Sequence, residues 1–252
     1  DRGLIAPGWK ADIVVLNNLD QCEAELVVSN GKVVSENLFS SRKLIKPIGR
    51  KTVKSKSIKS SDLVYFSDKN EIDVIGIIPG KIITDHLKVK ISNQDGVIYP
   101  DTKKDIAKIA VIERHGKNGN LSKGFVKGFG FEKGAVASTV CHDHHNIVVA
   151  GVNDEDMALS ANYLKEIEGG FVVAENGRIT AEIALPIAGL MSLKTFDEVY
   201  IELINLRKEA RKLGITLEEP FLQLAFLALP VIPHLKITDM GLVDVNRFEI
   251  IK

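Results

Sequence analysis

The segment from Cys141 to Met157, CHDHHNIVVAGVNDEDM, concentrates the residue types that could carry out chemistry in this chain. His142 and His144 have the His-x-His spacing of metal ligands, because alternate residues of a strand point to the same face. Asp143 and His145 would then share the opposite face. Zinc would need a third and often a fourth ligand, and the other three histidines lie singly and far away in the sequence.

Two other interpretations of this segment stay open. His142, Asp143, His145 and Asn146 could form a hydrogen-bonded corner between strands, because such side chains bind loop backbone well. Alternatively, Cys141 could be a nucleophile with a neighbouring histidine as its base. Residues adjacent on a strand point apart, however, which argues against this pairing. Spacing alone does not decide between a metal site and a corner.

The composition limits the classes of protein and partner. The 252 residues suffice for one large domain or two small ones, and the 45% hydrophobic fraction suffices for a core. Lysine plus arginine and aspartate plus glutamate both total 33, so we expect no nucleic-acid or membrane partner. Two cysteines, Cys22 and Cys141, suit a reducing compartment, so we expect a cytoplasmic protein. The most apolar stretch, residues 221–232, is shorter than the about 20 residues of a membrane span and should be core.

Strands and hairpins dominate the expected elements. A β-branched run predicts a strand over residues 11–16. Asn-Gly pairs predict hairpins over 25–36 and 171–185, because this dipeptide favours the type I′ turn. Further extended segments are expected over 71–78, 82–91, 106–113 and 235–251.

Helices are expected in two places. One starts at Asn153 or Asp154 and ends before Gly169-Gly170. The other spans Thr195–Leu213, where a single apolar stripe is formed by Phe196, Val199, Leu203, Leu206, Ala210 and Leu213. Hairpins with a few packed helices predict an α+β fold with mostly antiparallel sheets.

A basic segment occupies residues 40–61, with eight lysines and arginines and no acidic residue. It could bind a polyanion. No aromatic residue is interleaved for base stacking, so a solvated linker, or an edge strand protected by lysines, is favoured.

Two sets of residues resemble known families. Residues 3–34 (GLIAPGWKADIVVLNNLDQCEAELVVSNGKVV) resemble the segment through which amidohydrolases return from the catalytic barrel to a small β-sandwich. Four further blocks resemble the C-terminal domain of adenine deaminases: residues 110–115, 124–157, 185–191 and 229–245. That family usually has a small residue where this chain has His144, so His144 is not expected to be functional.

The resemblance implies an enzyme that hydrolyses adenine to hypoxanthine and ammonia with a binuclear manganese or iron site in a barrel. A barrel needs at least about 200 residues, and only 108 residues follow His144. We therefore expect the metal ligands upstream, and neither a metal nor catalytic residues in this chain. Asp1-Arg2-Gly3 begins in mid-motif, as expected for a piece of a longer protein. Residues 1–45 are expected to be sandwich strands and residues 46–252 the C-terminal domain.

The residues expected near the substrate, or supporting the residues that touch it, are Arg114, His115, His142, Asp143, His145 and Asn146. The expected partners are the protein's own barrel, adenine in the whole enzyme, and further copies in a homo-oligomer. Two alternatives stay open for the chain alone: a purine-binding module, and an oligomerisation module built on Thr195–Leu213 and residues 221–232.

Overall fold

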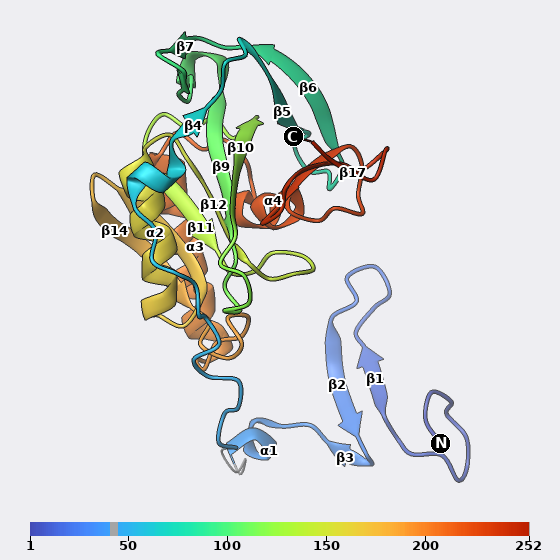
Figure 1. Ribbon diagram of the computed structural model, residues 1–252. Coiled ribbons are helices and arrows are strands. Elements are labelled where there is room, and N and C mark those ends of the chain that lie inside the picture. Colours follow the sequence, from blue (N-terminus) through green and yellow to red (C-terminus); the bar gives the residue numbers. More distant parts are fainter. Residues whose placement is uncertain (41–44, 252) are drawn as a thin grey trace. The chain divides into compact units, whose positions relative to one another are not determined.

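The computed structural model describes residues 1–40 and 45–251, which form two compact units, Asp1–Lys46 and Pro47–Lys252 (Figure 1). Arg42 and Lys43 of the basic segment lie outside the described residues. The predicted α+β class with mostly antiparallel sheets is confirmed.

The first unit is a small antiparallel sheet of order β1-β2-β3, followed by a short helix. The bounds are β1 Ile13–Leu16, β2 Ala24–Ser29, β3 Lys32–Val33 and α1 Glu36–Ser40. Asn30 and Gly31 both have positive φ, 48° and 76°, which is the conformation that the type I′ turn needs. The predicted hairpin is therefore confirmed. None of residues 1–40 is buried within the described part of the chain.

The second unit is built on an eight-stranded sheet of order β14-β13-β11-β12-β9-β10-β5-β6. All neighbours are antiparallel except β10 and β5. The strands are β5 Glu71–Ile77, β6 Thr84–Lys90, β9 Ile106–Ile112, β10 Leu121–Lys127, β11 Ala135–Ser138, β12 Ile147–Gly151, β13 Gly170–Glu175 and β14 Arg178–Ala184. The strands and the second hairpin expected in this region are confirmed.

Smaller elements flank this sheet. Two three-stranded sheets consist of β4 Tyr65–Phe66, β7 Asn93–Gln94 and β8 Val97–Ile98, and of β15 Leu235–Thr238, β16 Gly241–Asp244 and β17 Glu249–Ile251. The helices are α2 Asp154–Glu166, α3 Phe196–Lys212 and α4 Pro220–Leu227, with 3₁₀ turns η1 Ser60–Leu63 and η2 Thr102–Lys104.

Helices cover both faces of the sheet. In the central strand β9, Ala110 and Ile112 belong to the core under α2, whereas Ile109 and Val111 belong to the core under α3 and α4. Both predicted helices are present, and Asn153 caps α2 by accepting hydrogen bonds from two backbone N–H groups. Because the sheet is covered on both sides, every residue of β9 is buried.

Two sequence expectations need correction. Phe196 was expected on the apolar stripe that faces the core, but it is the first residue of α3, its side chain is 81% exposed, and its ring stacks on the exposed Tyr200 instead. The basic segment is neither an edge strand nor fully solvated. Its described part runs as irregular chain, and it buries Val53 and Ile58 while its lysines stay exposed.

In the described part of the chain, no helix combines the length and the apolar character needed to cross a bilayer.

Candidate functional site

The candidate residues come from neighbouring ends of two strands of the large sheet. Ile112 of β9 lies opposite Ile147 of β12, so residues 113–115 lie beside residues 141–146, here called the histidine loop. The histidine loop is a turn rather than a strand, closed by a 2.7 Å hydrogen bond from the His145 N–H to the Cys141 carbonyl oxygen. The expectation that His142 and His144 share one face of a strand is therefore wrong.

Arg114 joins the histidine loop to the turn at residues 186–191. Its side chain is 2% exposed, its Nε donates to the His145 carbonyl oxygen, and its Nη2 donates to the Ala188 carbonyl oxygen at 2.9 Å. Gly189 has φ +71°, and a Cβ there would lie 2.6 Å from Nη1, so a glycine is needed for this close approach. Burial lowers the pKa of Arg114.

Arg114 has no carboxylate partner among the described residues, and its Nη1 is buried without a hydrogen bond. Arg114 therefore links the histidine loop to the turn at residues 186–191 through hydrogen bonds to backbone carbonyl oxygens.

His144 is held by its two ring nitrogens. Its Nδ1 accepts a hydrogen bond from the Asn146 N–H at 3.2 Å, and its Nε2 lies 3.1 Å from the Ala228 carbonyl oxygen, which requires a proton on Nε2. Burial lowers the pKa of His144, so we assign it as neutral imidazole.

The Cys141 thiol lies 3.8 Å from Nδ1 of His144. Burial raises the pKa of this thiol well above its usual range. Because Nδ1 already accepts a hydrogen bond, it is not free to act as a base. This geometry disfavours the Cys141 nucleophile, which needs an accessible thiolate.

Three of the predicted residues form a rim on the outside of this framework: His115, His142 and Asp143. His115 and Asp143 are exposed, and His142 is half-buried. The His142 ring lies 5.1 Å from the Phe226 ring and 6.1 Å from the His145 ring, measured between centroids. The rim is thus the part of the predicted cluster that a neighbouring domain or a ligand could reach.

His145 contacts both Arg114 and the rim residue His142. It adopts a left-handed conformation with φ 49°, and its Nδ1 is buried without a partner in the described part of the chain. Burial, and then the positive charge of Arg114, lower the pKa of His145. Its half-buried ring therefore lies near the Arg114 cation.

Asn146 connects Arg114 to a residue that the sequence reasoning missed, Asp239. Its Oδ1 accepts a hydrogen bond from the Arg114 N–H at 3.2 Å, and its Nδ2 donates to Asp239 at 3.1 Å. Asp239 also accepts from the side-chain amides of Asn118 and Asn120 at 3.5 and 3.3 Å. One sequence signal could have located Asp239. The tripeptide Asp-Met-Gly at residues 239–241 separates two apolar runs, as a hairpin turn does.

The histidine loop does not offer a metal-ligand set. Among the residues that the structure describes, no three His, Cys, Asp or Glu side chains are placed to hold an ion. Of the proposed pair, His144 has both nitrogens engaged with the backbone. The described residues of the histidine loop therefore do not fit a metal ion.

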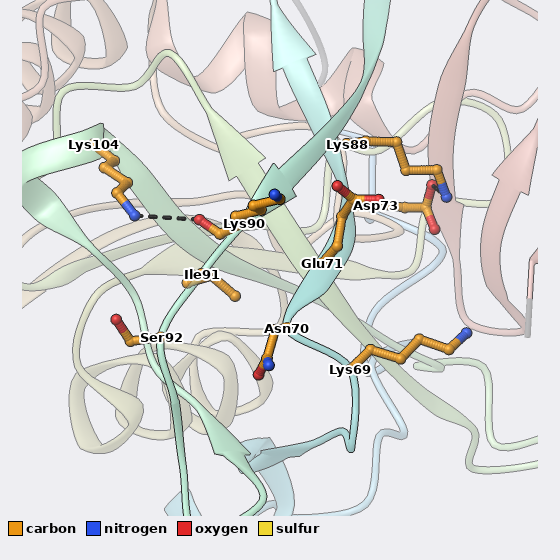
Figure 2. Close-up of a pocket in the computed structure, with 9 residues that line it drawn as sticks. All are labelled: Lys69, Asn70, Glu71, Asp73, Lys88, Lys90, Ile91, Ser92 and Lys104. Atoms are coloured by element: carbon orange, nitrogen blue, oxygen red, sulfur yellow. Dashed lines mark hydrogen bonds and ion pairs between the residues drawn. The ribbon is translucent and has the colours of Figure 1, made fainter.

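A cavity of about 830 Å³ lies elsewhere, beside the start of β5 and the end of β6 (Figure 2). Figure 2 shows Lys69, Lys88, Lys90 and Lys104 around it, and the last three have local partners or neighbours. Lys88 pairs with Asp73 at 2.6 Å, Lys90 lies opposite Glu71, and Lys104 donates to the Lys90 carbonyl oxygen at 3.2 Å. Charged pairs of this kind protect an edge strand such as β6 from unwanted pairing.

A family model described as adenine deaminase C-terminal domain matches residues 81–249. The chain belongs to this family. It is 58% identical over 251 residues to the adenine deaminase of Cereibacter sphaeroides strain ATCC 17025, 58% over 254 residues to that of Sinorhizobium fredii, and 56% over 251 residues to adenine deaminase 1 of Rhizobium meliloti. Each match covers 100% of this chain and 44% of the relative.

The chain therefore spans less than half the length of the curated relatives it matches. The four sequence blocks that resembled the C-terminal domain of adenine deaminases all lie within the residues matched by the family model. That resemblance is therefore confirmed.

Proposed function

We propose that the protein containing this chain hydrolyses adenine to hypoxanthine and ammonia. The observation that carries the proposal is the match, over the whole chain, to proteins named adenine deaminase. In this reaction water adds to C6 of the purine, and the exocyclic nitrogen leaves as ammonia after gaining a proton.

The manganese or iron that the family resemblance implies would activate that water, and we place its ligands in the portion of the protein outside these residues. The histidine loop, with His144 tied to backbone at both nitrogens, serves a different purpose. The role proposed for this chain is support of the catalytic portion rather than catalysis by itself. Both cysteines are free thiols, which suits the cytoplasmic location that we also propose.

The first unit is proposed to complete an amidohydrolase-type β-sandwich. Residues directly opposite each other in an antiparallel pair share a face, and Ile13, Val15, Leu26, Val28 and Val33 all share one face of the β1–β3 sheet. Val15, Leu26 and Val33 are 39–56% exposed within the described residues. An apolar face of this size calls for a covering sheet.

The rim is proposed to lie at the edge of the catalytic site. Arg114, His144 and Asn146 fix the histidine loop through contacts to three other segments. His142 and Asp143 then project from a rigid support, which is the arrangement that positioning residues need. Phe226, which contacts His142, also lines a cavity of about 480 Å³.

The test uses the full-length protein and this 252-residue piece, each supplied with manganese or iron. We expect the full-length protein to convert adenine to hypoxanthine with equimolar ammonia, and the piece to release none. If the full-length, metal-loaded protein releases no ammonia from adenine, the proposed activity is wrong. If the piece alone releases ammonia, the supporting role is wrong.

The rim is tested separately by His142→Ala in the full-length protein, with His234→Ala as the matched control. His234 is exposed, and its Nδ1 lies 2.9 Å from Oδ1 of Asn246. We expect only His142→Ala to lower kcat/KM for adenine, by about tenfold or more, with unchanged metal content. If both variants have the same kcat/KM for adenine, the rim does not lie at the edge of the catalytic site.

A further inference from the structure

Helix α3 has an apolar face that no described residue of the second unit buries. Leu206 and Ala210 face the core. The exposed face carries Phe196 (81% exposed), Tyr200 (52%), Ile201 (66%) and Ile204 (48%). Two apolar side chains just before the helix, Met191 and Leu193, are also more than half exposed. So many exposed large apolar side chains on neighbouring segments indicate an interaction surface.

Charges are divided between the two ends of this face. At 3.6 residues per turn, Asp197, Ile201, Ile204 and Lys208 follow one another along the same exposed side of α3. The acidic residue lies in the first turn and the basic residue near the last turn. Neither Asp197 nor Lys208 has an ion-pair partner among residues 1–40 and 45–251. The face is thus apolar at its centre, negative at its start and positive at its end.

We propose that this face of α3 docks against the same face of a second copy of the chain. The two helices would run antiparallel about a two-fold axis that passes between residues 202 and 203. Asp197 and Lys208 are equally far from that axis along the helix, about 8 Å at 1.5 Å per residue. Asp197 therefore meets the partner's Lys208, and Ile201 meets the partner's Ile204.

A second copy is the occupant that this pattern fits because a two-fold contact must be complementary to itself. The acidic start of each helix meets the basic end of the other, so each contact contains two equivalent ion pairs around an apolar centre. The antiparallel arrangement also opposes the two helix dipoles. Hydrolysis of adenine does not require this pairing, so the inference goes beyond the proposed function.

Charge reversal in the full-length protein tests the proposal, with sedimentation equilibrium as the measurement. We expect a dimer for the wild type, and a dissociation constant raised about tenfold or more by Asp197→Lys or by Lys208→Asp, since each disrupts two pairs. The two changes together in one chain restore both pairs with reversed sign. We expect the double variant to return to within about threefold of the wild type.

Two control variants keep the result interpretable. Lys103→Asp reverses an exposed lysine far along the chain from α3 and should leave the dissociation constant unchanged. Ile201→Glu with Ile204→Glu should give a monomer with unchanged far-ultraviolet circular dichroism. A monomeric wild type, or single reversals that the double variant does not rescue, overturns the proposal. A monomeric wild type whose Tm falls in the Ile201/Ile204 variant would assign the face to another part of the same chain.

Discussion

At the residue scale, the polar residues in and beside the histidine loop divide into those that hold it and those that are presented on it. Arg114, His144 and Asn146 form hydrogen bonds to backbone or to Asp239, whereas His142 and Asp143 are presented; His115 is exposed and also lies 2.7 Å from the His144 carbonyl oxygen through its Nε2. The division explains why so many polar residues are needed in so short a segment. A loop can present a side chain in a fixed direction only when its own backbone is bonded to neighbouring elements.

Replacing Arg114 by lysine keeps the charge but removes the forked donor. An ammonium cannot reach the carbonyl oxygens of His145 and Ala188 together, so at least one buried acceptor loses its partner. We expect a loss of about 1–3 kcal/mol in the free energy of unfolding of the 252-residue chain, measured by urea titration. Arg178→Lys, at an exposed position, is the control and should change the value by less than about 0.5 kcal/mol.

Lys236 predicts a stability change at alkaline pH. Its side chain is fully buried, and its Nζ donates to the carbonyl oxygens of Ile82 and Phe226 at 2.7 and 3.0 Å. Burial lowers its pKa from 10.5 to about 8. Because the unfolded chain then binds more protons than the folded chain between these values, this residue adds stability as the pH rises from about 8 to 10.5.

We therefore expect the stability of the wild type relative to Lys236→Met to increase by about 3 kcal/mol across that range. Urea titrations at pH 7.5, about 9 and about 10.5 measure it, and Lys103→Met, at an exposed lysine, should give a flat difference. A flat difference for Lys236→Met as well would mean that its ammonium is not penalised by burial.

At the element scale, the sequence predicted strands β5, β6 and β9, both Asn-Gly hairpins and both long helices, because their signals are local, but it did not predict β11, β12 or helix α4. Asn-Gly at 30–31 and 176–177 requires positive φ, and Asn153 caps α2 through its own side chain. The sequence could not predict which distant segments lie side by side in the folded chain. The register that sets residues 113–115 beside the histidine loop, and the turn that brings Asp239 to Asn146, depend on contacts between distant residues.

One such long-range contact attaches the segment after Pro47 to the end of α2. Arg50 donates from Nε and Nη2 to the Glu168 carboxylate at 2.9 and 2.6 Å, and the Lys51 N–H donates to it at 2.7 Å. The Arg50 side chain, and then the Lys51 N–H, lower the pKa of Glu168 from 4.5 to about 2.

A carboxyl group with a lowered pKa stabilises the fold above its unfolded value and loses that contribution as the pH falls through its folded value. Glu168→Gln should therefore be less stable than the wild type above pH 4.5, and the difference should shrink toward zero as the pH approaches about 2. Urea midpoints at pH 6, 4.5, 3 and 2 measure the effect. A difference that is independent of pH would mean that the ion pair does not form in solution.

At the scale of the whole molecule, the two units differ in what stabilises them. The second unit buries three apolar clusters around its sheets. The first has a three-stranded sheet in which no residue is buried, although one of its faces is apolar. Small sheets without a covering layer are marginally stable in water, because too little apolar surface is removed from solvent to offset the ordering of the chain.

The two units should therefore respond differently to the rest of the protein. In the 252-residue piece, we expect the backbone amides of β1 and β2 to exchange with deuterium within seconds, while those of β9 and β12 stay protected for hours. In the full-length protein, a covering sheet would slow exchange in β1 and β2 by orders of magnitude and leave β9 almost unchanged. Mass spectrometry of peptides from both proteins measures this contrast. Equal exchange of β1 and β2 in both proteins would mean that this apolar face is not a sandwich interface, whereas slower exchange of these strands in the full-length protein would support a covering sheet on that face.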